Sequence, residues 1–142
     1  MVPQAFLTLV KYFEGLSLQA YLCPAGIPTI GYGHTGKEVY IGMPKISVGL
    51  AERLLYEDTL YYFSIAAKIS PCLRLYPEQH VAIADFIYNL GETRYKASTL
   101  RKKVEAFQWE AAEAELLKWV LGGGKRLPGL VKRRRLEATL LR

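Results

Sequence analysis

The chain has 142 residues, 51% of them apolar, and a formal net charge of +6 at pH 7. The apolar residues are interspersed with charged ones, which is typical of a soluble globular protein. No stretch approaches the roughly 20 apolar residues that a membrane-spanning helix needs. The length supports one domain with a sizeable core, at most divided into two lobes.

The positive charge is concentrated in the last third of the chain. Residues 1–93 carry 6 Lys and Arg against 8 Asp and Glu, a net −2, whereas residues 94–142 carry 13 against 5, a net +8. Such asymmetry favours a polyanionic partner, either nucleic acid or an anionic cell envelope. A set of solvated helix faces would give the same pattern.

The N-terminal segment lacks the marks of a secretory signal. It has no basic start and no small-residue cleavage site, and Lys11 interrupts its apolar run. We therefore expect synthesis in the host cytoplasm and delivery by another route to any site outside it. Without secretion, Cys23 and Cys72 are expected to be two thiols, the alternative being a disulfide between them.

The first predicted element is a helix over residues 3–14. Pro3 suits its first turn, apolar residues recur at helical spacing as far as Phe13, and Gly15 is a typical residue just after a helix. Glu14 therefore lies in the last turn, where the helix dipole disfavours a carboxylate. Because a residue placed against local preference is often functional, Glu14 is a candidate site residue.

Residues 17–46 have a different character. Apolar and polar residues alternate over 17–22, Pro24-Ala25-Gly26 forms a turn signal, and a β-prone run follows around Thr29 and Ile30. This pattern predicts a small, twisted antiparallel sheet, followed by a loop over residues 37–46.

The rest of the chain is predicted to be helical. Ser47 is a typical N-cap for a long helix that runs to about Ser70, where Pro71 follows. The further predicted helices cover about residues 77–90, a segment beginning near 98, residues 109–121, and the segment after Pro128-Gly129 to the end.

These elements predict an α+β fold in a single domain, residues 1–142. A small antiparallel β lobe would span about residues 16–46. A larger helical lobe would span about residues 47–142 and pack with helix 3–14, and the long helix would join the lobes.

Two residues of the first segment have the chemistry that glycosidic bond cleavage requires. Such cleavage needs an acid that protonates the leaving oxygen and, opposite it, a nucleophile or a positioned water. Glu14 follows an apolar run that would desolvate it and raise its pKa, and the Thr29 hydroxyl could position a water. Residue chemistry alone makes this a weak hypothesis, because most Glu and Thr residues have no such role.

The spacing of three residues carries a more specific signal. Glu14 is followed after eight residues by Cys23 and after five more by Thr29, with E-G-L-x-L-x-A-Y and T-I-G-Y-G-H-T-G around them. This pattern resembles the phage lysozyme family (endolysins, glycoside hydrolase family 24), and the resemblance implies a lysozyme-like fold. It continues over nearly the whole chain through Glu78-Gln79, Tyr88-Asn89-Leu90-Gly91, Ser98-Thr99-Leu100, Trp119 and the G-L-V-K-R-R block at 129–134.

The resemblance implies a role for each of the three residues. Glu14 would be the general acid, and Thr29 would hold the attacking water. Cys23 stands where many relatives carry Asp, and its role as base, nucleophile or bystander stays open. We expect the Glu14 carboxylate to raise the pKa of the Cys23 thiol. The structural alternative for Cys23 is a small buried apolar residue.

Further positions follow from the same resemblance. His34 and Asp58 would form a structural ion pair between the β lobe and the long helix. Tyr88 and Asn89 would contact the substrate, the alternative being ordinary helix packing. Thr35 and Thr99 match saccharide-contacting positions, and the run 132–135 could place one arginine against Glu14. Trp109 and Trp119 are expected to be core residues rather than sugar platforms, because both lie in helical repeats.

The resemblance implies a muramidase that hydrolyses the β-1,4 bond between N-acetylmuramic acid and N-acetylglucosamine in bacterial peptidoglycan. It would act as a monomer in the periplasm or outside, without cofactor or metal, since His80 is the only histidine besides His34. One alternative is a peptidoglycan-binding or scaffolding module that has lost activity, which Cys23 permits. Another is a nucleic-acid binder, which no recognition motif supports.

Overall fold

The computed structural model describes residues 1–142 and divides them into two compact units, Met1–Tyr61 and Tyr62–Arg142. The chain is mostly helical with two small antiparallel sheets, so the predicted α+β class is confirmed. No helix combines the length and the apolar character that crossing a membrane requires. The boundary between the two units lies within the long helix α2 (Val48–Ile69).

The first unit begins with α1 (Gln4–Glu14), whose buried residues are Phe6 and Val10. The helix ends where the sequence predicts. Gly15 adopts φ +69°, a left-handed value that favours glycine, and its N–H donates to the Lys11 carbonyl. Glu14 is consequently the last helical residue, as expected.

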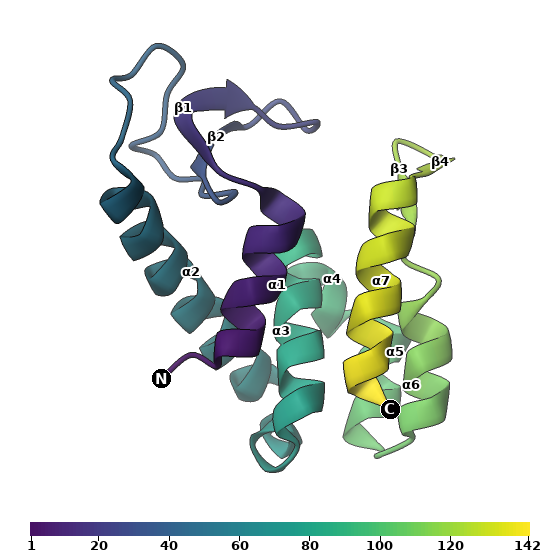
Figure 1. Cartoon of the computed structure of the whole chain (residues 1–142). Coiled ribbons are helices and arrows are strands. Elements are labelled where there is room, and N and C mark those ends of the chain that lie inside the picture. The colour runs from purple at the N-terminus through teal and green to yellow at the C-terminus, as the bar shows by residue number, and fades with distance from the viewer. The chain divides into compact units, whose positions relative to one another are not determined.

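A two-stranded antiparallel sheet follows, made of β1 (Ser17–Leu22) and β2 (Pro28–Gly31). Tyr21 pairs with Thr29 in the register, and an irregularity separates this pair from the pair of Ser17 with Gly31. Figure 1 shows both strands beyond the C-terminal end of α1. One face of the sheet contributes to a small core of Ala20, Ile30 and Val39, against which Met43 and Ile46 pack.

Helix α2 has the N-cap that the sequence predicts. The Ser47 hydroxyl accepts a hydrogen bond of 3.0 Å from the Leu50 N–H, which satisfies one of the free donors at a helix start. The helix ends before Pro71, which opens a short 3₁₀ helix, η1 (Pro71–Leu75).

The second unit is built around α3 (Pro77–Leu90), whose residues 80–87 are all buried. Gly91, at φ +94°, ends this helix as predicted. Helix α7 (Pro128–Leu141) packs against α3 and α6 and is drawn yellow in Figure 1. The remaining helices are α4 (Glu92–Lys96), α5 (Thr99–Glu105) and α6 (Trp109–Leu116).

One predicted helix is too long. The segment predicted as a helix over residues 109–121 is helical only to Leu116. Two short strands, β3 (Leu121–Gly122) and β4 (Lys125–Arg126), then form a hairpin. Gly123 and Gly124 between them adopt φ +58° and +80°, so the glycine run forms a tight turn rather than only ending a helix. Sequence reasoning also missed α4 and η1.

Candidate active site

The Glu14 side chain lies directly against the backbone of Gly33. Gly33 adopts φ +80°, and a Cβ built there would lie 2.5 Å from Glu14 Oε1, so the carboxylate would have to move. Glu14 comes from the end of α1, whereas Gly33 follows β2, so this contact fixes the acid beside the sheet. Sequence reasoning did not assign Gly33 a role, although it lies in the quoted T-I-G-Y-G-H block.

Glu14 and Cys23 both lie near the Tyr21 side chain. Its pKa is raised first by burial, then by the negative charges of Glu14 and of Cys23. Both charges therefore act on the same phenol. Because Tyr21 pairs with Thr29 across the sheet, these four residues belong to one part of the first unit.

Cys23 opens the turn between the two strands. Its N–H donates to the Ile27 carbonyl at 3.0 Å, and the Gly26 N–H donates to the Cys23 carbonyl at 2.8 Å. The Ile27 backbone N–H lowers the pKa of the thiol most, and the Ala25 N–H and Thr29 hydroxyl lower it further, against partial burial. The expectation that Glu14 raises this pKa is therefore wrong, because hydrogen bonding to the thiolate dominates.

Thr29 is buried, and its hydroxyl donates to the Ile27 carbonyl at 2.8 Å. Since a hydroxyl has one donor and two acceptor sites, the oxygen can still accept a hydrogen bond from another group. Cys23 and Thr29 thus hydrogen-bond to the same short turn, the first through its thiol and backbone and the second through its hydroxyl.

An ion pair connects α1 with the start of α2. The Lys11 ammonium lies 2.9 Å from Glu52 Oε1, and the Tyr32 hydroxyl donates to the same oxygen at 3.2 Å. The hydrogen bond from Lys11 lowers the pKa of Glu52 and raises that of Lys11. These contacts join the last turns of α1, the segment after β2 and α2, and so support the end of α1 at which Glu14 sits.

His34 and Asp58 lie in contact, with 2.7 Å between Nδ1 and Oδ2. The other ring nitrogen lies 2.6 Å from Glu38 Oε1, a partner that sequence reasoning missed. The hydrogen bond to Asp58 raises the pKa of His34 to about 9, with a further contribution from Glu38. Glu38 lies in the exposed turn that follows Thr35, and the two contacts of His34 join this segment to α2.

The other predicted substrate residues belong to the second unit. Tyr88 and Asn89 lie in the last turn of α3, both partly buried, and the Tyr88 ring packs edge-on against Tyr62 with centroids 5.1 Å apart. Asn89 Oδ1 accepts a hydrogen bond of 2.7 Å from Arg134. Thr99 is exposed at the start of α5.

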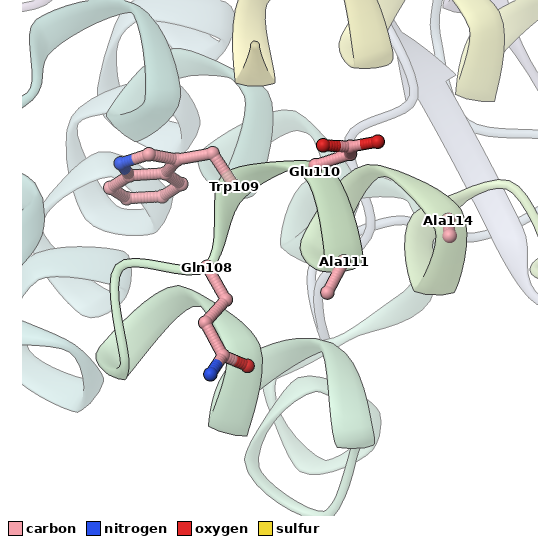
Figure 2. Close-up of a pocket in the computed structure, with 5 residues that line it drawn as sticks. All are labelled: Gln108, Trp109, Glu110, Ala111 and Ala114. Carbon is pink, nitrogen blue, oxygen red and sulfur yellow. The ribbon is translucent and has the colours of Figure 1, made fainter.

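A pocket of about 550 Å³ lies at the start of α6, and Figure 2 shows its lining residues. They are Gln108, Trp109, Glu110, Ala111 and Ala114. None of the candidate site residues lines it. Trp109 is only partly buried here, whereas Trp119 packs edge-on against buried Phe86 with centroids 5.4 Å apart. No cluster of His, Cys, Asp and Glu is arranged to hold a metal ion.

Comparisons with known proteins agree with this architecture. A family model described as phage lysozyme matches residues 11–137. The chain is 40% identical over 145 residues to an endolysin of Acyrthosiphon pisum secondary endosymbiont phage 1, covering 98% of this chain and 96% of the relative. It is 33% identical over 131 residues to a SAR-endolysin of Escherichia phage Mu, covering 91% of this chain and 74% of the relative.

Solved structures are similar as well. An endolysin from Escherichia coli O157:H7 phage FAHEc1 has a TM-score of 0.82 and 31% identity, covering 99% of this chain and 92% of that one. The muramidase domain of SpmX from Asticaccaulis excentricus has a TM-score of 0.84 and 27% identity, covering 99% and 97%. The predicted lysozyme-like fold is thereby confirmed.

Proposed function

Because the chain belongs to the phage lysozyme family and is a lysozyme-type glycoside hydrolase, we propose that it cleaves the β-1,4 bond between N-acetylmuramic acid and N-acetylglucosamine in bacterial peptidoglycan. The observation that carries this proposal is the placement of Glu14 against Gly33, in the unit that also contains the Cys23 turn and Thr29 in β2. The protein is then an endolysin that acts on the cell wall.

Glu14 is the proposed general acid. It donates its proton to the glycosidic oxygen as the bond to the anomeric carbon breaks, so that the leaving sugar departs as an alcohol. Its position supports this role, because the carboxylate lies against the Gly33 backbone and α1 is anchored through Lys11 and Glu52. A carboxyl group in a fixed place can meet the same substrate atom in each turnover.

Thr29 and Cys23 are proposed to orient and deprotonate the water on the opposite face of the sugar. The Thr29 oxygen accepts a hydrogen bond from this water, which orients it toward the anomeric carbon. Cys23, with a thiol pKa lowered by the Ile27 N–H, accepts the proton that the water loses as its oxygen bonds to carbon. Glu14 loses one proton and Cys23 gains one, so the step is balanced.

Thr35, Tyr88, Asn89 and Thr99 are the proposed substrate contacts. They offer hydroxyl and amide groups that suit sugar hydroxyls and N-acetyl groups. The proposed role of the His34–Asp58 pair is structural, because it fixes the residue directly before Thr35 against α2. We propose that a monomer made in the host cytoplasm carries out this reaction in the periplasm or outside.

The test uses purified peptidoglycan and two matched variants. Glu14→Gln should abolish clearing of a wall suspension while far-UV circular dichroism and melting temperature stay near wild type. Glu110→Gln, an exposed glutamate on α6, should clear walls at the wild-type rate. Fully active Glu14→Gln would end the proposal for this residue.

The bond itself is identified from the products. Borohydride reduction of the new ends, followed by mass spectrometry, should give reduced N-acetylmuramic acid. Reduced N-acetylglucosamine instead would assign cleavage to the other glycosidic bond of the polymer.

A second candidate function is wall binding without catalysis, which the thiol at position 23 favours because it stands where the family resemblance implies a carboxylate. In this case the purified protein would co-sediment with walls but release no new reducing ends. Cys23→Asp would then gain activity that the wild type lacks.

A further inference from the structure

Four charged side chains are buried together between α3 and α7 of the second unit. Arg133 makes two hydrogen bonds of 2.9 Å to the Asp85 carboxylate. Arg134 Nη2 lies 3.0 Å from Glu137 Oε2, and its Nε lies 2.8 Å from Oε1. Each residue of the cluster is at most 4% exposed. Two guanidinium groups and two carboxylates thus share one interior site.

Such a cluster is a poor way to gain stability. Removing charges from water costs several kcal/mol per ion, and their attraction often only offsets that cost. Burial and the nearby Asp85 raise the pKa of Glu137 well above its usual value, and burial lowers that of Arg134. Burial thus disfavours the charged forms of this pair, so stability alone does not account for it.

Arg134 connects this interior cluster to the surface. Its Nη2 donates both to Glu137 and to Asn89 Oδ1, the latter at 2.7 Å. Asn89 lies in the last turn of α3 and is only partly buried. One guanidinium nitrogen therefore joins a fully buried carboxylate to a side chain that reaches solvent.

This contact determines which way the Asn89 amide is turned. Guanidinium has only donors, so the amide must present its oxygen to Arg134. The amide nitrogen, with two N–H donors, then faces away from the guanidinium. No protein acceptor lies within hydrogen-bond distance of that nitrogen.

We propose that Arg134, braced by Glu137, is a positioning residue that fixes the Asn89 amide with its N–H donors turned outward, toward an acceptor oxygen of an N-acetylated sugar. This inference rests on the proposed function, which places Asn89 among the substrate contacts. The matching oxygens are the N-acetyl carbonyl and the ring hydroxyls. An unbraced asparagine would spend part of its time with the amide reversed, offering the sugar an acceptor where a donor is needed.

The first test reads the amide orientation directly. Asn89 is the only asparagine of the chain, so labelling with ¹⁵N-asparagine gives a single side-chain amide pair in the NMR spectrum. In the wild type the two protons should have widely separated shifts and slow exchange with water. Arg134→Lys keeps the charge but not the forked donors, and should bring the pair close to free-asparagine shifts.

The control is Arg94→Lys, an exposed arginine on α4, which should leave the amide pair unchanged. Glu137→Gln replaces the carboxyl group that contacts Arg134 by an amide of the same shape and should give an intermediate spectrum. An unchanged pair in both Arg134→Lys and Glu137→Gln would overturn the proposal.

The second test measures sugar binding without catalysis. Every variant is made in the Glu14→Gln background and titrated with the N-acetylglucosamine trimer by calorimetry. Arg134→Lys should bind about tenfold more weakly, the effect of roughly one lost hydrogen bond. In the active background the same change should raise KM more than it lowers kcat.

Asn89→Asp keeps an acceptor for Arg134 but removes both amide donors, and it leaves the buried cluster intact. It should weaken trimer binding at least as much as Arg134→Lys, without lowering the melting temperature. Wild-type binding by Asn89→Asp would overturn the proposal even if Arg134→Lys fails to fold. An active Glu14→Gln variant would instead count against the proposed function, and would leave the amide spectrum unaffected.

Discussion

The Glu14 carboxylate lies so close to the Gly33 backbone that a side chain at position 33 would displace it. A Cβ at position 33 would lie 2.5 Å from Oε1 and 2.9 Å from the carboxyl carbon of Glu14. Glycine is thus required at position 33 for two reasons. Its φ of +80° favours a residue without a Cβ, and the Glu14 carboxylate occupies the space that a Cβ would need. The proposed acid is held in place by a residue that does no chemistry.

We therefore expect Gly33→Ala to lose about 100-fold or more in kcat on purified walls, because a displacement of roughly 1 Å at a reacting group can cost that much. The left-handed backbone adds about 1–2 kcal/mol of destabilisation. Kinetics on walls and urea unfolding would measure the two effects.

Gly42→Ala is the matched control. Gly42 also has a left-handed φ, of +92°, but nothing lies within 4 Å of a Cβ there. It should lose similar stability and keep its activity. Equal activity of the two variants would contradict the positioning role of Gly33.

The two cysteines should differ in reactivity. Both are free cysteines. The Ile27 N–H lowers the pKa of Cys23, whereas burial raises that of Cys72. Because the thiolate is the nucleophile, Cys23 should react with iodoacetamide several-fold faster at pH 7.5. Rates measured on Cys72→Ser and Cys23→Ser, each with one thiol left, provide the comparison.

If Cys23 is the base, alkylating it should also stop wall cleavage, and Cys23→Asp should retain more activity than Cys23→Ser. Full activity of the alkylated protein would assign Cys23 as a bystander. Faster labelling of Cys72 would contradict the effect of the turn on the thiol.

The charge pair at His34 should make stability depend on pH. Asp58 raises the pKa of His34 from 6.5 to about 9 in the folded protein. A raised pKa means that the stabilisation is fully present below pH 6.5 and disappears as the pH rises through 9. Allowing for solvent screening at this partly exposed site, we expect His34→Gln to cost about 1–2 kcal/mol at pH 6 and little near pH 10.

Glu38 sets the lower limit of the pH range in which the His34 contacts stabilise the fold. Its pKa is lowered by His34, so its contribution holds above its usual value near 4.5 and is lost as the pH falls further. The chain has two histidines, and burial lowers the pKa of His80. Proton NMR should thus show one histidine titrating near 9 and one below 6.5. Two titrations near 6.5 would contradict the His34 pair.

The sequence predicted the local features of the fold well. Ser47 and Gly91 mark helix ends by their own chemistry, and these limits are confirmed. The prediction failed at residues 117–126. The spacing of Trp119 and its neighbours continues a helical pattern, whereas in the structure a hairpin forms around the glycine run. Residue propensities alone do not show that a tight turn with two short strands is more stable here than one more helical turn.

The candidate site was predictable to a different extent. Glu14, Cys23 and Thr29 were found because their spacing is a family pattern. Gly33, Glu38 and the α3–α7 cluster were not, because their roles depend on which faces of distant elements meet. Asp85 offered a signal, since it stands alone among the apolar residues 81–87 of a buried helix. A carboxylate there requires a partner, but its identity follows only from the packing of α7.

The last prediction concerns the contact between Asp85 and its partner Arg133. Asp85→Asn should destabilise the protein by about 3–5 kcal/mol, because it leaves the Arg133 guanidinium buried without its carboxylate. Glu57→Gln, which removes an exposed contact of 3.6 Å to Arg53, should cost less than about 0.5 kcal/mol. Urea unfolding of both variants measures the difference. Similar costs would mean that water or Glu137, 4.0 Å from Arg133 Nε, replaces the lost partner.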